Sequence, residues 1–247
     1  MPQESALFYL LDSVDSTNNY AMANVHAGLA THGMAWFANE QTQGKGQRGK
    51  GWNAEPGQNI ILSIVIKPPP IFRAQPFFLS SLVAIACAEF LQKNCAQTIS
   101  IKWPNDLYWR DRKAGGILIE NNFSGDQWKW AVIGIGINVN QTQFSPDLKN
   151  PVSIQEIAGK ELDPELLTRQ LHQIILDKVN SADDEAIKLL LPALNARLFK
   201  QGQQVRLKQG SAVFTTTIKA VNEAGQLITY DTMERTFDHG MVEWLMS

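Results

Sequence analysis

The chain has 247 residues, of which 44% are hydrophobic, so we expect one sizeable folded domain with a smaller appendage rather than a disordered chain. Its 22 lysines and arginines against 24 aspartates and glutamates give a formal net charge of −2, which excludes a global field that attracts DNA or an anionic membrane. The two cysteines, Cys87 and Cys95, match neither a disulfide framework nor a zinc ligand set.

The chain carries no targeting or membrane signal that we recognise. Its first residues lack both a basic region and a small-residue cleavage site. The longest uncharged stretch, residues 74–88, is shorter than the roughly 18 apolar residues that a membrane span needs. We therefore expect a cytoplasmic protein with no membrane partner.

Apolar runs and turn formers predict the elements of the larger unit in chain order. Strands are expected at 8–11, 34–38 and 60–66, with a helix after the first strand that starts near Ser16 and stops at Gly28. The long apolar segment 75–92 predicts a buried central helix. Four further strands, mostly antiparallel, are expected at 99–103, 107–110, 117–121 and 128–139. Helices at 167–179 and 183–198 then close a unit that we place at 1–198.

The last fifty or so residues have a different pattern. Short alternating segments at 205–207, 213–221, 227–230 and 242–245 are separated by single glycines. This pattern is typical of a small β-barrel module, which we place at 199–247.

A glycine-rich segment, GKGQRG, follows the second predicted strand, and its glycines have G-x-G-x-x-G spacing: Gly44, Gly46 and Gly49. A dinucleotide-binding loop with this spacing opens a helix at its third glycine, but turn formers and helix breakers follow here. A protein kinase is excluded because no H-R-D or D-F-G segment follows. A plain surface turn would explain the glycines, but it explains less readily why three cations and no carboxylate share this stretch: Lys45, Arg48 and Lys50. We favour an anion-binding loop, because glycine lets backbone N–H groups approach an anion closely.

A second turn-rich cluster lies in the segment KWPNDLYWRDRKAGGILIE. One interpretation is an ordinary Pro-Asn-Asp turn and a polar hairpin. The other is functional, because Asn105 and Asp106 offer oxygen ligands suited to Mg²⁺ and Lys113 offers a point charge. In the segment VIGIGINVN, Gly134 and Gly136 would let a ligand or another backbone approach, although close strand packing explains them equally.

Other reaction centres are not indicated. The four histidines are scattered without metal-ligand spacing, and no G-x-S-x-G segment is present. Chemistry here therefore means activating one bound substrate for attack by another.

Four ordered motifs together resemble the biotin protein ligases: DSTNNYA at 15–21, EQTQGKGQRGKGW at 40–52, KWPNDLYWRDRKAGGILIE at 102–120 and GIGINV at 134–139. The tail from about residue 201 is similar to that family's small C-terminal β-barrel. The resemblance implies an α+β fold related to class II aminoacyl-tRNA synthetases, with a mixed, largely antiparallel sheet. It also implies that the chain makes biotinyl-AMP from biotin and Mg-ATP and transfers biotin to one lysine of a carboxyl carrier domain of a carboxylase.

The family roles can be placed on matching positions only. A set of short polar side chains would bind the ureido ring of biotin: Ser16, Thr17, Asn18 and Gln41. The glycine loop would wrap the carboxylate and later the adenylate phosphate, through Gly44, Lys45, Gly46 and Gln47. Lys113 would contact the reacting oxygens of both substrates, and Trp52 would pack on the adenine. The remaining ATP-binding residues would be Arg48, Asn105, Asp106 and Asn138, with Asp106 the Mg²⁺ ligand and Lys102 a further candidate.

The cations have a physical reason to be present. A carboxylate that attacks an α-phosphate brings like charges to about 4 Å, which costs roughly 4 kcal/mol at an effective dielectric near 20 and slows the reaction about a thousandfold. As catalytic groups, Lys45, Arg48 and Lys113 would relieve this repulsion together with Mg²⁺.

Two positions depart from part of the family, because some members have arginine where this chain has Lys45 and Gln47. Our hypothesis is that Arg48 or Lys50 compensates in retaining the adenylate. No room for a helix-turn-helix domain precedes Asp15, so repressor activity is not expected.

Two alternative functions and one question about oligomeric state stay open at this point. A lipoate or octanoate ligase would share the fold and the adenylate chemistry, and a non-catalytic module would bind biotin or a nucleotide without reaction. Self-association as a homodimer through a strand edge near 60–66 is a third question, since the sequence does not separate an edge from a buried strand.

Overall fold

A computed structural model describes residues 7–245; residues 1–6, where the predicted absence of a targeting signal falls, lie outside the described part. The larger unit is built on a seven-stranded sheet with strand order β1-β2-β3-β7-β6-β5-β4. Only β1 and β2 pair in parallel, so the prediction of a mixed, largely antiparallel sheet is confirmed. In sheet order the strands are Phe8–Val14, Ala35–Gln41, Asn59–Ile66, Gln127–Asn138, Arg112–Ser124, Asp106–Trp109 and Ser100–Lys102.

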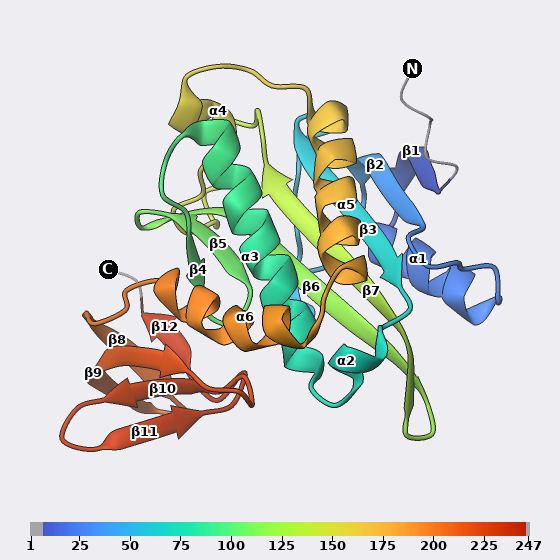
Figure 1. The fold of residues 1–247 in the computed structure, drawn as a ribbon. Helices are drawn as coiled ribbons and strands as arrows, with labels where there is room; N and C mark the ends of the chain where they lie inside the picture. The colour runs from blue at the N-terminus through green and yellow to red at the C-terminus, as the bar shows by residue number, and fades with distance from the viewer. Residues whose placement is uncertain (1–6, 246–247) are drawn as a thin grey trace.

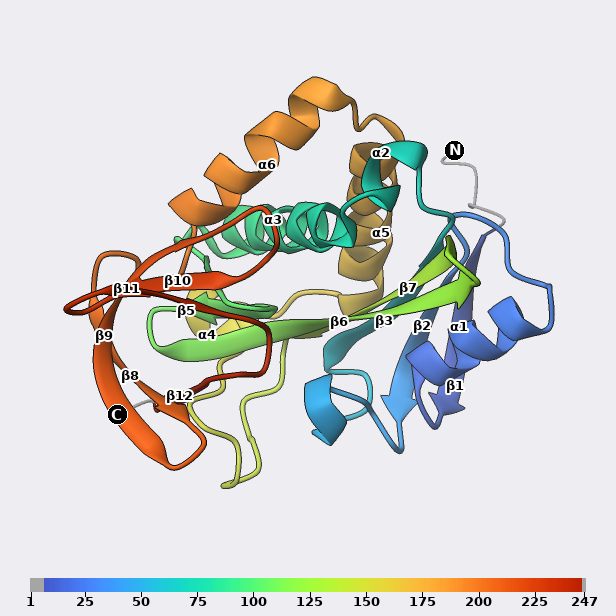
Figure 2. The ribbon, with the colours of Figure 1, turned by 90° about the horizontal axis from the view of Figure 1, so that it is seen from below.

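Helices cover both faces of this sheet (Figures 1 and 2). On one face lie α3 (Pro76–Cys95) and α5 (Pro164–Asn180), with α6 (Asp184–Ala196) packed on α3. On the other lies α1 (Thr17–His26). The alternation of β3 explains this arrangement, because Ile64 and Ile66 join the core around α3 while Val65 packs in a separate cluster with α1.

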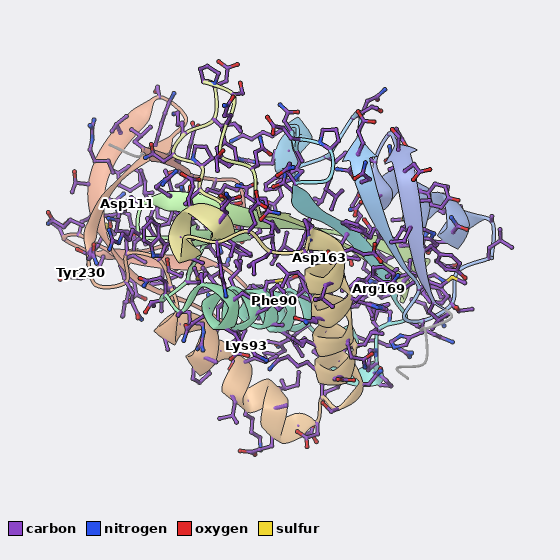
Figure 3. All side chains as sticks on the ribbon, turned by 90° about the horizontal axis from the view of Figure 1, so that it is seen from above. Phe90, Lys93, Asp111, Asp163, Arg169 and Tyr230 are labelled. Carbon is purple, nitrogen blue, oxygen red and sulfur yellow. The ribbon has the colours of Figure 1, made fainter. Side chains whose placement is uncertain are left out.

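The ends of the helices follow from local chemistry. Asp163 caps α5 by accepting hydrogen bonds from the first-turn amides of Glu165 and Leu166 at 2.9 and 3.1 Å (Figure 3). The α3 helix ends at Ala96, whose backbone is left-handed at φ 52°. Among the described residues α3 is the one helix with the length and composition of a membrane span, and 61% of its most apolar window is buried inside the fold. It is therefore the central core helix that the sequence predicted.

The C-terminal residues form a second, five-stranded antiparallel sheet with order β11-β10-β9-β8-β12. Its strands, in that order, are Glu234–Phe237, Leu227–Tyr230, Ala212–Val221, Gln204–Gln209 and Glu243–Leu245. Side chains of the larger unit form hydrogen bonds with the C-terminal sheet. Trp103 Nε1 donates to the Gly225 carbonyl at 2.9 Å. Asn195 of α6 accepts from Val221 N at 2.7 Å and donates to Val221 O at 3.0 Å.

Several details differ from the sequence-based expectations. The strand expected at 117–121 begins at Arg112, so Lys113 lies within β6 rather than before it. Four short elements have no counterpart in the predictions: the 3-10 helix η1 (Gln47–Gly49), α2 (Pro70–Arg73), α4 (Ile154–Ala158) and β11. The strand at 60–66 is interior, since β3 pairs with β2 on one side and β7 on the other and all its residues are buried. The expectation of a free strand edge there is therefore wrong, because β3 lies between two strands and its residues are buried.

Candidate active site

A cavity of about 880 Å³ lies where the large sheet meets the C-terminal sheet. Its wall combines the start of α1, the glycine loop, the middle of β6 and β7, the 147–151 loop and residues 239–244. Thirteen of the fourteen site residues predicted from the sequence line it: Ser16, Thr17, Asn18, Gln41, Lys45, Gly46, Gln47, Arg48, Trp52, Asn105, Asp106, Lys113 and Asn138. The exception, Gly44, is packed directly behind the wall, where a Cβ would lie 2.2 Å from the Trp52 carbonyl oxygen.

One end of the cavity is a buried polar network at the start of α1. Thr17 N and Oγ1 lie 2.7 and 3.0 Å from Gln41 Oε1, so a side chain of β2 accepts the first orphan amide of the helix. The N-cap residue, Ser16, makes no capping bond with its own side chain. Ser63 Oγ lies 2.8 Å from Thr17 Oγ1 and 2.6 Å from Asn18 Oδ1. These short polar groups therefore form one connected unit.

The network continues toward the glycine loop through a carboxylate. Asn18 Nδ2 donates to Glu120 Oε2 at 2.8 Å, and Glu120 Oε1 lies 3.9 Å from Lys45 Nζ. The amide of Asn18 also packs flat on the backbone of Gly134, where a Cβ would come within 2.3 Å of Asn18 Oδ1. Only glycine permits this approach, so Gly134 is explained by a close side-chain contact, which neither of the two sequence-based interpretations had included.

The glycine loop closes on itself over the cavity. Gly46 N donates to Lys50 O at 2.7 Å and Trp52 N to Gly44 O at 2.9 Å. Between them, Arg48 takes a left-handed backbone conformation (φ 58°) and its guanidinium donates to the carbonyl oxygen of Gly240. Arg48 thus lines the cavity while it joins the loop to the C-terminal sheet, a contact that the sequence did not indicate.

The Trp52 indole lies across β7, where a Cβ on Gly136 would come within 2.4 Å of its Cε2 atom. Lys113 Nζ is 5.8 Å from the ring centroid, a cation–π distance. The indole Nε1 is buried and has no hydrogen-bond partner. A buried donor without a partner costs free energy, so this wall of the cavity is suited to a ligand that carries an acceptor.

The opposite end of the cavity is charged. Lys113 Nζ and Asp106 Oδ1 form an ion pair at 2.6 Å, with the two side chains about one third and one quarter exposed. The neighbouring asparagines support this pair through the backbone: Asn138 Nδ2 donates to Val152 O at 3.0 Å and Lys113 O at 3.4 Å, and Asn105 Nδ2 donates to Ile117 O at 2.6 Å. Both amide donors of Asn138 and one of the two amide donors of Asn105 are therefore already used within the fold.

Lys102 stands beside this pair in an aromatic surround. Its Nζ lies 3.2 Å from Tyr108 Oη and faces the rings of Tyr108, Phe199 and Trp244 at 4.8, 5.9 and 5.4 Å. Burial lowers the pKa of Lys102 to about 8, against the attraction of Asp106. The ammonium and its neutral amine are therefore about equal in free energy near pH 8, and the ammonium is still favoured at pH 7.

Sequence reasoning missed Ser63, Glu120 and the residues of the C-terminal sheet that line the cavity. Ser63 had a signal, since it is the one polar residue in the apolar run 60–66. Glu120 is the last residue of the segment KWPNDLYWRDRKAGGILIE, and the sequence suggested no role for it. His239 packs edge-on to Trp103 at 6.1 Å, and burial, followed by the charge of Arg48, lowers its pKa. Nothing in the sequence linked residue 239 to a loop near residue 48.

Within residues 7–245 there is no group of three or more His, Cys, Asp or Glu side chains that could hold a metal ion by itself. Three acidic residues line the cavity without forming such a group: Asp106, Asp147 and Glu243. A single carboxylate such as that of Asp106 is suited instead to an ion that arrives on substrate phosphates and keeps part of its water shell, as Mg²⁺ does.

Comparisons with known proteins identify the family of the chain. Residues 10–138 match the model of the biotin/lipoate A/B protein ligase family. The chain is 30% identical over 228 residues to a biotin--[acetyl-CoA-carboxylase] ligase of Paracoccus denitrificans, covering 89% of this chain and 92% of that protein. It is 36% identical over 166 residues to the bifunctional ligase/repressor BirA of Salmonella typhimurium, where it spans about half the relative's length. A biotin protein ligase from Aquifex aeolicus in complex with biotin and ATP has the same fold, with a TM-score of 0.81, 24% identity and coverage of 98% and 100% of the two chains.

Proposed function

The chain belongs to the biotin/lipoate A/B protein ligase family, and we propose that it is a biotin protein ligase that activates biotin with ATP and transfers it to a lysine of a carboxyl carrier domain. In the first step a carboxylate oxygen of biotin attacks the α-phosphorus of ATP, the bond to the β-phosphate breaks, and pyrophosphate leaves. In the second step the ε-amine of the carrier lysine attacks the acyl carbon, AMP leaves, and the amine proton passes to solvent.

One observation carries this proposal: a single cavity joins a buried polar network at one end to a glycine loop and a lysine–aspartate pair at the other. The polar end matches the donors and acceptors of a cyclic urea. The charged end matches two anions that must meet. A non-catalytic module that only stores one small molecule would need one of these two ends, not both in the same cavity.

The assigned roles follow from these positions. Thr17, Asn18 and Gln41 hold the ureido ring, together with Ser16. The loop residues Gly44, Lys45, Gly46 and Gln47 enclose the carboxylate, and Trp52 covers the nucleotide. Lys113 bridges the carboxylate and phosphate oxygens, and its ammonium lowers the barrier where negative charge gathers in the transition state. Lys45, once its ammonium has moved from Glu120 to the substrates, stabilises the same negative charge. Arg48, in the glycine loop, also stabilises it.

Mg²⁺ enters with the nucleotide. Asp106 would hold it beside Asn105 and Asn138, and when bound the ion neutralises phosphate charge. The protein's own contribution is then to orient both substrates and to keep water from the mixed anhydride, which the loop can do because its glycines let it close over bound ligand.

The partner, the location and the domain division belong to the same proposal. The Paracoccus denitrificans relative is named for acetyl-CoA carboxylase, so we propose a biotin carboxyl carrier domain as acceptor, in the cytoplasm. We assign catalysis to residues 1–198 and the small C-terminal domain to 199–247. The cavity nevertheless includes residues of both, so the C-terminal domain completes the site.

A lipoate or octanoate ligase is the main alternative within this family. Its substrates end in an apolar chain, and the buried hydroxyl and amide groups at the far end of the cavity would lose hydrogen bonds to water with nothing in return.

The test is exchange of labelled pyrophosphate into ATP with three acids supplied separately. We expect exchange with biotin only, followed by mass-spectrometric detection of one biotinylated lysine on a carrier domain. Exchange with lipoate or octanoate alone would assign the alternative, and no exchange with any acid would refute the activation chemistry.

A further inference from the structure

Ser63 lies at the centre of strand β3 and does not line the cavity. Its neighbours along the strand are apolar, and its side chain is fully buried on the α1 face. A buried hydroxyl needs hydrogen-bond partners, and Ser63 Oγ has two, Thr17 Oγ1 at 2.8 Å and Asn18 Oδ1 at 2.6 Å. Ser63 therefore reaches the ligand only through two residues of the proposed ureido site.

The direction of the hydrogen bond between Ser63 and Asn18 is fixed by the other partners of the Asn18 amide. Asn18 Nδ2 points at two groups that only accept, Glu120 Oε2 at 2.8 Å and the Leu118 carbonyl at 3.3 Å. The amide oxygen must then be the atom that faces Ser63. Because an amide oxygen only accepts, the single proton of the Ser63 hydroxyl is donated to Asn18.

Proton counting then sets the polarity of Thr17. Three oxygen–oxygen contacts run through the chain Gln41–Thr17–Ser63–Asn18, at 3.0, 2.8 and 2.6 Å, but its two hydroxyl groups supply only two protons. With the serine proton on Asn18, the threonine proton can serve either the 2.8 Å contact to Ser63 or the 3.0 Å contact to Gln41 Oε1. The shorter contact costs more without a proton, because the repulsion between two oxygens rises as they approach, so the proton is assigned to Ser63. The longest contact, between Thr17 Oγ1 and Gln41 Oε1, is left without a proton.

Two oxygens that face each other without a proton repel, and a donor placed between them relieves the repulsion. Gln41 Oε1 already accepts from Thr17 N at 2.7 Å, and it keeps a second lone pair. Thr17 Oγ1 and Gln41 Oε1 can therefore both accept a hydrogen bond from one N–H group of a ligand. If the Thr17 hydroxyl were free to rotate, it could bind a donor or an acceptor equally well.

We propose that Ser63 is a positioning residue that makes Thr17 and Gln41 a paired acceptor and so selects acids that carry an N–H donor at the end remote from the carboxylate. The inference rests on the proposed function and deepens it, because it names the group that distinguishes a cyclic urea from the chains of lipoate and octanoate. Glu120 is the anchor that gives the network its direction.

The test compares biotin with the two isosteric analogues in which one ureido N–H is replaced by a ring oxygen. The readout is kcat/KM for the acid in pyrophosphate exchange. For the wild-type protein we expect at least one analogue to be rejected about a hundredfold or more, because its ring oxygen would face the paired acceptor. In Ser63→Ala the Thr17 hydroxyl can turn and donate to that oxygen. The ratio of kcat/KM for biotin to kcat/KM for the analogue should then fall about tenfold, with KM for ATP unchanged.

Ser81→Ala is the matched control, since Ser81 is also a buried serine with one hydroxyl hydrogen bond, to Phe77 O at 3.0 Å within α3. It should keep the wild-type ratio. If Ser63→Ala does not fold, Ser63→Cys fills the same space with a weak donor, and the same fall is expected. An unchanged ratio in a folded Ser63 variant overturns the inference alone, whereas a wild-type protein without biotin-dependent exchange overturns the proposed function.

Discussion

The role of Lys113 can be tested by replacing it with methionine, which keeps the length of the side chain and removes its charge. The Lys113–Asp106 pair is partly exposed, so its loss should change the free energy of unfolding by only about 0–1 kcal/mol. The effect on chemistry should be larger. A unit charge about 4 Å from a phosphoryl oxygen contributes roughly 4 kcal/mol at an effective dielectric near 20, and loss of one such stabilising group typically lowers kcat by about 10²–10³.

The assay is biotin-dependent pyrophosphate exchange, with urea unfolding measured in parallel. Lys200→Met is the control, because Lys200 Nζ also lies 2.6 Å from a carboxylate, Asp111 Oδ1, with a lysine side chain of similar exposure (29% against 32%). Lys200 does not line the cavity, so the control should keep full exchange. If folded Lys113→Met retained more than about a tenth of wild-type kcat, the proposed stabilisation of the transition state would be wrong.

Three further outcomes are expected. Gly136→Ala should displace the Trp52 ring, which a Cβ would meet at 2.4 Å, and so raise KM for ATP. Gly134→Ala should raise KM for biotin instead. If each variant raised both constants equally, the assignment of one end of the cavity to each substrate would be contradicted. Gln47→Arg should slow release of biotinyl-AMP in a filter-retention assay, and an unchanged rate would show that retention does not depend on this side chain. Burial lowers the pKa of Lys102 to about 8, so the unfolded chain binds more protons above that pH and the free energy of unfolding should rise by about 2 kcal/mol from about pH 7.5 to about pH 9.5. Urea unfolding of Lys102→Met at both pH values should lack that rise, and a variant with the wild-type slope would exclude Lys102 as its source.

Local sequence patterns were enough to predict most strands of the sheet and the segments that build the site. Runs such as 60–66 and 128–139 predicted strands because alternation and β-branched residues act locally. The glycine and Pro-Asn-Asp motifs marked the loop and the turn for the same reason, since backbone freedom and turn chemistry depend on neighbours in the chain. Even so, β11 was missed because Phe237 is its one apolar residue, and α4 was missed because its five residues span little more than one helical turn.

How those residues contact one another depends on the folded arrangement of the chain. The carboxylate of Glu120 meets Asn18 across 102 residues of sequence, Ser63 meets it across 45, and the Arg48 guanidinium meets Gly240 across 192. Hydrogen-bond direction depends on which acceptor faces which donor in space, and spacing along the chain does not contain that information. The sequence therefore indicated the groups that bind the substrates, while the packing of α1 on β3 and β6 fixed which of them donate and which accept.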